Sequence, residues 1–454
     1  MRMVTGLSVL VLGIGGIGHA VVTSLETGIE RVDPFRDMKN RPGETNGTNI
    51  LVVGTDGRDR ITPEQKKKYR LGGAPCRCTD TVMLVHISKD RHRASVVSLP
   101  RDSYAEIPEH TDATTGKHHK PHPVKLNAAY AEGGPALTVR TVEHMTDVKI
   151  DHYLEIDFTS FMKTVDAVGG VEICTARPMK DSYTGLDLPV GTHKLNGGQA
   201  LQYVRSRHVD GAADLGRMQR QQRFLAALVH RMTSSGVLLN PVKFRTVTST
   251  MLDSVRADKG FGTEQMLALR RAMRGFTAAS SEFTSVPVGD VSHPVKGVGS
   301  TVKWHPVKSK KLFQLLRDDK PLAPHRPKRP AATLVDVSPQ QIRVQVYNGT
   351  RVDGLGDRVD KALRGTGFVT TRAPLNSGNG AVRRTYVTYD PRWDRSAKSL
   401  RAALPGSELR PVKNQGPTLK VMAGADYKGV TPVRAEEPHR GEFGAVTGDQ
   451  VVCP

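Results

Sequence analysis

The segment ILVVGTDGR at residues 50–58 decides the fold of this chain. Its first four residues form an apolar run that stops at Gly54, which is typical of a short, fully buried strand. Asp56 and Arg58 follow at once, so an acid and an arginine stand just beyond the end of that strand. Two further runs, TVMLVHI at 81–87 and ASVVSL at 94–99, predict strands, and the basic turn SKDRHR between them favours a hairpin.

Helical and strand-like segments alternate downstream of this hairpin. We expect a helix at 127–146 interrupted by Gly133 and Gly134, strands at 152–158 and 171–174 on either side of a helix at 159–167, and an amphipathic helix at 214–233. This alternation predicts an α/β domain over residues 46–319.

The rest of the chain consists of three segments that differ in composition. Residues 320–339 carry five prolines and no periodic pattern, which is typical of a linker. The alternating strand IRVQVY at 342–347 and a helix at 355–364 begin a small α/β unit over 340–430. The polar tail at 431–454 is expected to be loose.

The N-terminal segment is apolar from Met3 to about Leu25, long enough to span a bilayer as a helix. We expect a transmembrane signal anchor at 1–25 and a stalk at 26–45, giving a single-pass type II protein of the cell membrane whose bulk is extracytoplasmic. A cleaved signal peptide and a buried N-terminal helix are the alternatives.

The net charge of +21 implies an anionic partner. Nucleic acid, an anionic membrane and an anionic wall polymer all meet this requirement. Aromatic residues make up only 5% of the chain, and no run alternates them with basic residues as a base-stacking platform would. We therefore expect a membrane and a wall polymer as partners, and no nucleic acid.

Arginines are concentrated at 205–223, which contains Arg205, Arg207, Arg217, Arg220 and Arg223. The pattern favours a phosphate or pyrophosphate clamp, because an arginine fork matches phosphate oxygens two at a time. A solvated basic helix is the alternative.

Helical spacing reduces the number of residues in this segment that can contact the same phosphate. Asp214, Arg217 and Gln221 stand at i, i+3 and i+7 and so share one helix face, whereas Arg220 and Arg223 lie off that face and are expected in solvent. Arg205 and Arg207 point to the same side only if the chain is extended there.

Carboxylates for the same site come from three strand ends. GTDGR at 54–58 and SLPRDS at 98–103 place charged side chains just after expected strands, and TDT at 79–81 places Asp80 just before one. Ligands of α/β sheets usually bind at such ends. Two carboxylates with several arginines suit a magnesium-bound diphosphate, because Mg²⁺ takes few protein carboxylates plus phosphate oxygens.

These motifs, together with KLNAAYAEGG, DFTSFMKTVDAVGGVEI, LQYVRSR and DLGRMQRQQRF, resemble in this order the LytR-CpsA-Psr family of wall-polymer ligases. The resemblance covers residues 50–230, and residues 342–430 resemble the LytR-type C-terminal domain of some members. It implies a mixed central sheet flanked by helices, with an apolar tunnel for a polyprenyl tail. It also implies transfer of a glycopolymer phosphate from a polyprenyl-diphosphate carrier to a peptidoglycan hydroxyl.

The resemblance assigns roles residue by residue. Asp56 and Asp80 would hold Mg²⁺, and Arg58 and Arg101 would contact the diphosphate. The clamp would be completed by Arg205, Arg207, Arg217 and Gln221, with Asp214 orienting arginines. Many members carry an arginine where this chain has Cys78, and Arg77 stands one place earlier. Asp102 is either a general base or a salt-bridge partner of Arg101.

Two other groups of residues have weaker interpretations. A disulfide from Cys76 or Cys78 to Cys174 is expected outside the cell, with free thiols as the alternative. His118, His119 and His122 suggest a metal site, but no carboxylate or cysteine accompanies them in the sequence, which favours a flexible loop.

Three other functions compete with the transferase. A pyrophosphatase acting on the same lipid carrier would differ only in using water as the acceptor. A non-catalytic wall-binding protein would not need the acids Asp56 and Asp80. A DNA-binding regulator is disfavoured by the N-terminal span and by the lack of a helix-turn-helix pattern.

Overall fold

A computed structural model describes residues 30–36, 38–57, 61–72, 78–209, 211, 213–234, 255–262, 265, 277–323, 332–378, 382–435 and 443–453. The expected anchor, Arg58 and Arg77 lie outside these ranges. Within them, none of the helices combines the length and the apolar character that crossing a bilayer requires.

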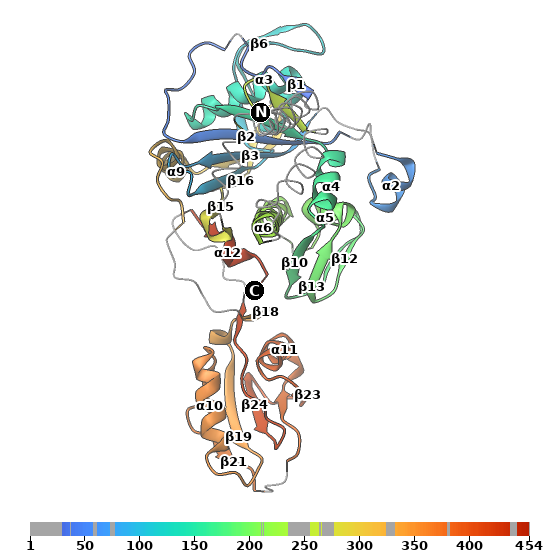
Figure 1. Ribbon diagram of the computed structural model, residues 1–454, viewed down its shortest axis with the longest axis vertical. Coiled ribbons are helices and arrows are strands. Elements are labelled where there is room, and N and C mark those ends of the chain that lie inside the picture. The colour runs from blue at the N-terminus through green and yellow to red at the C-terminus, as the bar shows by residue number, and fades with distance from the viewer. Residues whose placement is uncertain are drawn as a thin grey trace, which may run out of the picture.

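The first part of the chain is built on a mixed, eight-stranded sheet (Figure 1). From one edge to the other its strands are β1 (Glu30–Val32), β14 (Val255–Asp258), β9 (His152–Ile156), β2 (Thr48–Thr55), β3 (Thr79–Ile87), β4 (Ala94–Leu99), β15 (Ser281–Ser285) and β26 (Val446–Thr447). Parallel pairs such as β2–β9 and β4–β15 alternate with antiparallel pairs such as β2–β3 and β3–β4. The expected mixed sheet and the hairpin of residues 81–99 are confirmed.

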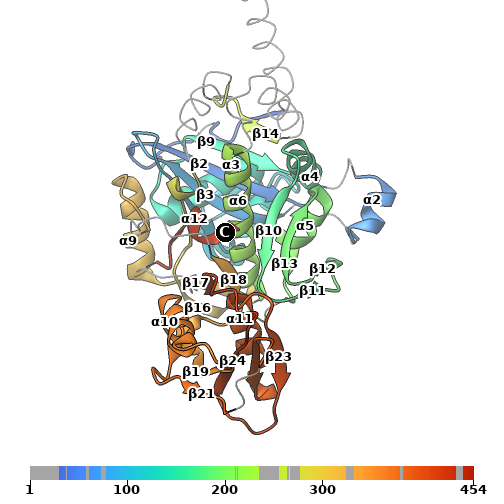
Figure 2. The same ribbon diagram turned by 60° about the horizontal axis from the view of Figure 1, so that its bottom comes forward.

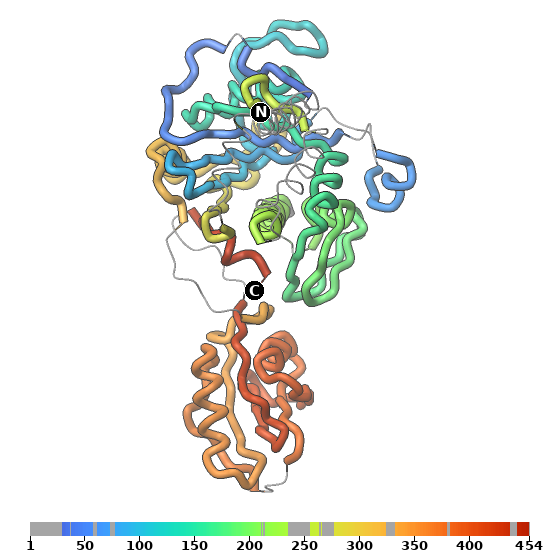
Figure 3. Tube along the Cα trace, in the orientation of Figure 1, coloured from blue at the N-terminus to red at the C-terminus, as the bar shows by residue number. Residues whose placement is uncertain are grey.

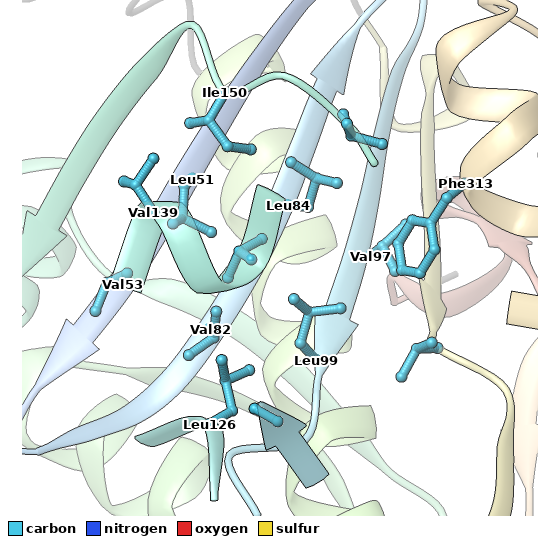
Figure 4. Close-up of a cluster of buried hydrophobic side chains, with 14 of the residues drawn as sticks. Leu51, Val53, Val82, Leu84, Val97, Leu99, Leu126, Val139, Ile150 and Phe313 are labelled. Atoms are coloured by element: carbon cyan, nitrogen blue, oxygen red, sulfur yellow. The ribbon is translucent and has the colours of Figure 1, made fainter. Parts of the chain in front are cut away.

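Both faces of the sheet are covered, which explains why the run at 50–53 is continuously apolar. Leu51 and Val53 enter a core beneath helices α3 (Leu126–Thr146) and α9 (Pro306–Arg317), as Figure 4 shows. Val52 points the other way, into a cluster that includes Ala226 of helix α6 (Ala213–Ser234). Helix α3 is kinked at Gly134, whose φ of 60° interrupts it where two glycines precede Pro135.

A further layer packs beside α6 (Figure 1). It consists of helices α4 (Phe158–Ala167) and α5 (Gly197–Arg205) with the hairpins β10 (Val171–Thr175)–β13 (Gly191–Leu195) and β11 (Met179–Asp181)–β12 (Leu186–Leu188). This layer has its own apolar core, to which α6 contributes Phe224 and Ala227. Helix α6 therefore lies between two cores and buries opposite faces.

Shorter elements complete this part of the chain. They are helix α2 (Pro63–Lys68), the strands β5 (Tyr104–Ile107), β6 (His110–Thr111), β7 (His118–His119) and β8 (His122–Lys125), and the hairpin β16 (Val288–Val295)–β17 (Gly299–Trp304). Strand β5 pairs with β8, and β6 pairs with β7, so residues 104–125 form a double hairpin between β4 and α3.

A second sheet with a separate core forms the C-terminal lobe (Figure 2). Its strands run in the order β20 (Val369–Thr370), β19 (Arg343–Asn348), β24 (Thr418–Ala423), β22 (Tyr386–Tyr389) and β23 (Glu408–Pro411), with β21 (Leu375–Asn376) also on β19. Helices α10 (Leu355–Gly365) and α11 (Asp394–Ala403) pack on it, and β18 (Thr333–Val335) pairs with β25 (Val433–Ala435) beside it. The expected small α/β sheet is confirmed.

The end of the chain returns to the first sheet (Figure 3). Strand β26 pairs with β15, helix α12 (Gly448–Val451) packs against α6, and Cys453 forms a disulfide with Cys174. The expectation of a loose tail is therefore wrong for residues 443–453. The expected pairing of Cys174 with Cys76 or Cys78 is also wrong, because a partner 279 residues away cannot be inferred from cysteine spacing.

Candidate active site

Three neighbouring strands place charged residues at the same end of the central sheet, where β2 and β4 end and β3 begins. We call this end of the strands the sheet edge. Because β3 runs antiparallel to β2 and β4, its first residues lie beside the last residues of those strands. Gly54 lies opposite Thr81 and Thr55 opposite Thr79, so Asp80 is the extra residue of a bulge. Asp56 and Arg101 follow β2 and β4 at this same edge, as the three sequence motifs predict.

Asp80 and Arg101 form an ion pair through Oδ1 and Nη1. Two hydrogen bonds hold the loop that carries Arg101. The main-chain oxygen of Arg101 accepts the N–H of Asn127 at 3.0 Å, and Ser103 Oγ donates to the main-chain oxygen of Pro100 at 2.6 Å. Asp102 lies 3.7 Å from Arg101 Nε and 3.3 Å from Lys125 Nζ. The geometry thus makes Asp102 an ion-pair partner that positions Arg101.

Helix α6 brings a second arginine to Asp80. Arg217 donates from Nη2 to the main-chain oxygen of Asp80 at 3.1 Å, and the same nitrogen lies 2.9 Å from Asp214 Oδ1. Gln221, one turn further along, donates to Thr81 Oγ1 at 3.0 Å. The predicted helix face of Asp214, Arg217 and Gln221 therefore meets the start of β3.

Arg217 is buried, with 4% of its surface exposed. Burial lowers the pKa of Arg217 to about 10, although the nearby Asp214 and Asp80 carboxylates favour its charge. The side chain therefore remains a cation at neutral pH. Arg207 joins the group through the same oxygen of Asp214, with Nη2 3.4 Å from Oδ1.

Two arginines of this group, Arg101 and Arg217, each keep a donor that makes no hydrogen bond to the described residues. Among the described residues, Nε of Arg101 and Nε of Arg217 are buried and have no hydrogen-bond partner. A buried donor without an acceptor is costly, and an anionic oxygen is the acceptor that would satisfy it best. The site therefore has the chemistry of an anion-binding site.

Arg205 and Arg207 have different neighbours. Helix α5 includes Arg205, and the chain becomes extended at Ser206 with φ −60° and ψ 139°. The Arg205 guanidinium lies 5.1 Å from the centre of the Phe158 ring, whereas Arg207 reaches Asp214. The two arginines thus contact different residues, and Arg207 joins the Asp80–Asp214 group.

Asp181 fixes the turn that carries Arg207, and it was not singled out from the sequence. Its buried carboxylate accepts the N–H groups of Arg207 at 2.8 Å and His208 at 3.1 Å. Burial alone would raise the pKa of Asp181, but the N–H donors of His208 and Arg207 outweigh burial and lower it. No local sequence pattern reports this role, because Asp181 and Arg207 are joined only by the fold.

The expectation that Arg220 lies in solvent is wrong. Arg220 is 2% exposed and donates from Nη2 to the main-chain oxygen of Ser206 at 2.5 Å. It is buried because α6 lies between two layers, so a residue off the Asp80 face still faces protein. Arg223 on the same helix is partly exposed.

Asp56 and Asp80 are the carboxylates at this end of the sheet that could hold a divalent cation. The Asp80 side chain is 30% exposed, and among the described residues its Oδ2 has no hydrogen-bond or ion-pair partner. Asp56 is buried at the end of the adjacent strand. Two carboxylates with one free oxygen are a suitable partial ligand set, since Mg²⁺ is usually completed by water and phosphate oxygens.

The predicted site residues are thus brought together to different degrees. Direct contacts link Asp80, Arg101, Arg207, Asp214 and Arg217, and Gln221 joins them through Thr81. Asp56 lies one strand away and Arg205 lies on Phe158. Cys78, at the start of the second motif, is disulfide-bonded.

The chain matches the LytR_cpsA_psr family over residues 20–314. Residues 341–427 match a second family, described as LytR cell envelope-related transcriptional attenuator. The first match covers more than half of the chain, and this protein belongs to the LytR-CpsA-Psr family.

Individual relatives agree with this assignment. The probable cell wall biosynthesis protein LcpB of Corynebacterium glutamicum is 34% identical over 311 residues, covering 68% of this chain and 70% of the relative. The cell wall biosynthesis protein LcpA of the same organism is 26% identical over 482 residues, covering 100% of this chain and 92% of the relative. The polyisoprenyl-teichoic acid–peptidoglycan teichoic acid transferase TagU of Enterococcus faecalis is 28% identical over 265 residues, covering 58% and 79%.

Proposed function

We propose that this protein is a phosphotransferase of cell-wall assembly. It would move a glycopolymer phosphate from a polyprenyl-diphosphate carrier to a peptidoglycan hydroxyl and leave polyprenyl phosphate. The observation that carries the proposal is the pair of buried Nε donors of Arg101 and Arg217, which have no hydrogen-bond partner among the described residues although both guanidinium groups contact Asp80 Oδ1. The names of its relatives, which include a teichoic acid transferase, support the same reaction class.

The residues of the site would act by position and charge. Phosphoryl transfer depends mostly on alignment and on neutralising the phosphate oxygens, so no covalent protein nucleophile is required. Arg101 and Arg217 would bind the diphosphate with Arg58, Arg205 and Arg207 around it. Asp214, which contacts both Arg207 and Arg217, would hold those two guanidinium groups at a fixed separation.

Asp56 and Asp80 would hold Mg²⁺ when the diphosphate is bound. A bound Mg²⁺ supplies positive charge that neutralises phosphate oxygens and favours departure of the polyprenyl phosphate. The protein's own contribution is to keep the free oxygen of Asp80 directed away from its arginine partners. Arg101 and Arg217 achieve this by both engaging Oδ1.

The polyprenyl tail would lie in an apolar tunnel between the sheet and the α4–α5 layer. Helix α6 lies between these layers and presents apolar side chains to both, because Leu225 packs with the sheet-side core while Leu228 packs with the α4–α5 core. The rings of Phe161 and Phe224 lie 5.1 Å apart between these elements. We further propose that residues 1–25 anchor the chain in the membrane, where a polyprenyl carrier would also be found.

A transfer assay with the purified full chain tests the proposal. The reaction would contain Mg²⁺, a polyprenyl-diphosphate-linked glycan and peptidoglycan, and both linked glycan and released phosphate would be measured. Glycan linked to peptidoglycan through phosphate, lost in Asp80→Ala, is the expected result. Release of phosphate without linkage would show a hydrolase, and binding without either product would show a wall-binding protein; both results would contradict the proposal.

A further inference from the structure

The double hairpin at residues 104–125 gathers histidines around one carboxylate of helix α3. His110 begins β6, His119 ends β7 and His122 begins β8, and α3 packs against both β6 and β8. Glu132 of α3 stands two residues before the Gly134 kink and contacts His110 of β6 and His122 of β8. The ring centres of the three histidines lie 5.4–5.8 Å apart.

The imidazole nitrogens converge on a single oxygen atom. His110 Nε2 lies 3.3 Å and His122 Nε2 lies 3.2 Å from Glu132 Oε2. One ring nitrogen of His119 and one of His122 lie with a Glu132 oxygen inside a mutual distance of 4.8 Å. Tetrahedral ligands at about 2.0–2.1 Å from a zinc ion are separated by about 3.3 Å. The distance from His122 Nε2 to Glu132 Oε2, 3.2 Å, is close to this value.

Backbone hydrogen bonds to Nδ1 of His110 and of His122 determine which ring nitrogen of each faces Glu132. His110 Nδ1 donates to the Pro108 carbonyl oxygen at 2.9 Å, and His122 Nδ1 donates to the Lys120 carbonyl oxygen at 2.8 Å. A carbonyl oxygen only accepts, so both Nδ1 atoms carry hydrogen. In the neutral rings the Nε2 lone pairs therefore point at the carboxylate, the arrangement that second-shell hydrogen bonds give to metal-binding histidines.

Without a cation this arrangement is unfavourable. His110 Nε2 and Glu132 Oε2 are buried and, among the described residues, have no hydrogen-bond partner. Lone pairs facing an anionic oxygen repel it. One divalent ion between them removes this repulsion, because it is attracted to the ring lone pairs and to the carboxylate together.

We propose that His119, His122 and Glu132 bind a divalent transition-metal ion of the zinc class, with His110 packed against the Glu132 carboxylate beside them. Imidazole nitrogens with one carboxylate suit Zn²⁺ better than Mg²⁺ or Ca²⁺, which prefer all-oxygen ligands. The ligands come from the double hairpin and from α3, so the ion would join these two elements. The site is separate from Asp56 and Asp80 and does not depend on the proposed transferase activity.

The position of the site gives the ion a structural role. The segment that it would hold begins just after Arg101 and ends in α3, where Asn127 N–H bonds to the Arg101 carbonyl oxygen. A hydrogen bond of 2.7 Å from Ala113 N–H to the main-chain oxygen of Glu132 already joins the hairpin to the helix. Zinc would therefore stabilise the hairpin against the helix that supports the Arg101 loop.

The chain offers a matched control for testing this site. His118 neighbours His119 but pairs with Glu109 at 2.7 Å, and both side chains are largely exposed. Substituting His118 removes an imidazole from the same hairpin without touching Glu132. His118→Ala should therefore bind zinc as the wild type does.

The experiment is a zinc titration of the untagged full chain in detergent, competed against a colorimetric chelator. The wild type and His118→Ala should each bind one zinc ion, and His119→Ala, His122→Ala and Glu132→Gln should bind at least about 100-fold more weakly. Removing zinc should lower the unfolding temperature of the wild type and leave that of His122→Ala unchanged.

Two results would overturn the proposal. One is a wild-type chain that is folded by circular dichroism yet takes up no zinc at tens of micromolar concentrations. The other is a folded His122→Ala or Glu132→Gln variant with wild-type affinity. Glu132→Gln keeps the shape of the side chain, so its binding loss reports the missing charge.

Discussion

Arg217 of helix α6 donates a hydrogen bond to the main-chain oxygen of Asp80 at 3.1 Å. This bond joins a helix to the bulged start of β3, two elements 137 residues apart in the chain. Arg217 also lies 3.9 Å from Asp80 Oδ1, so it holds both the backbone and the carboxylate of that residue. The buried arginine thus positions the carboxylate that is proposed to bind magnesium.

Replacing Arg217 by lysine should therefore impair both stability and transfer. A lysine ammonium cannot reproduce the fork that spans Asp80 and Asp214, so Arg217→Lys should lower the free energy of unfolding by about 1–3 kcal/mol. Transfer should fall by about 10²-fold or more, as when one donor to a developing charge is lost. Urea unfolding and the transfer assay measure the two effects, and wild-type values for both would show that Arg217 only fills space.

Asp181 should influence activity through the turn that holds Arg207. In Asp181→Asn, an NH₂ group replaces one carboxylate oxygen. This NH₂ group is a donor, so it cannot accept the main-chain N–H groups that the oxygen accepts in the wild type. We expect transfer to fall about tenfold or more because Arg207 loses its fixed position. An unchanged rate together with reduced stability would limit Asp181 to a structural role.

The contribution of Asp181 should also depend on pH in a defined direction. Its pKa is lowered in the folded protein, so the carboxylate stabilises the fold above its unfolded pKa, about 3.9. That stabilisation is lost as the pH falls through the folded pKa. The difference in unfolding free energy between wild type and Asp181→Asn should be constant above about pH 5 and shrink below about pH 4. A difference that grows on acidification would contradict the assignment.

Gly197 sets the distance between α5 and α4. A Cβ on Gly197 would lie 2.3 Å from the main-chain oxygen of Met162, which cannot rotate away. Gly197→Ala should therefore cost about 1–3 kcal/mol by overpacking. Gly365→Ala is the matched control, since a Cβ there meets nothing within 4 Å, and it should unfold at the wild-type urea concentration. If both variants unfold at the same urea concentration, α5 can move away from α4 without loss of stability, which would contradict this prediction.

The disulfide between Cys174 and Cys453 should hold the tail on the first sheet. Strand β26 makes only two register pairs with β15, too few to hold a chain end alone. In Cys453→Ser, the tail should be removed by carboxypeptidase faster than in the wild type, while the core resists. Equal rates of removal would show that β26 and α12 hold the tail without the disulfide.

Much of the fold follows from local pattern. The expected strands at 81–87 and 94–99 and the helix at 214–233 correspond to β3, β4 and α6, because each has a continuous apolar run or face that a layer covers. The helix spacing also placed Asp214, Arg217 and Gln221 on one face. These features need only near neighbours in the sequence.

The features that the sequence did not reveal depend on contacts between distant segments. The partner of Cys174 is 279 residues away, and the burial of Arg220 depends on layers on both sides of α6. The stretch TTGKHHKPHP that holds three of the hairpin histidines contains no carboxylate of its own, but the fold brings Glu132 of α3 to His119 and His122. Residue types alone report none of these relationships.

The most direct test of the proposed transferase is the rate of phosphate-linked glycan transfer by arginine variants of the full chain. Arg101→Ala and Arg217→Ala should each reduce transfer by about 10²–10³-fold, because each removes a donor to the diphosphate. Arg410→Ala, whose arginine pairs with Glu408 in the C-terminal lobe, should transfer at the wild-type rate. If the Arg101 and Arg217 variants, folded and stable, match Arg410→Ala, the sheet edge around Asp80 is not the site of transfer.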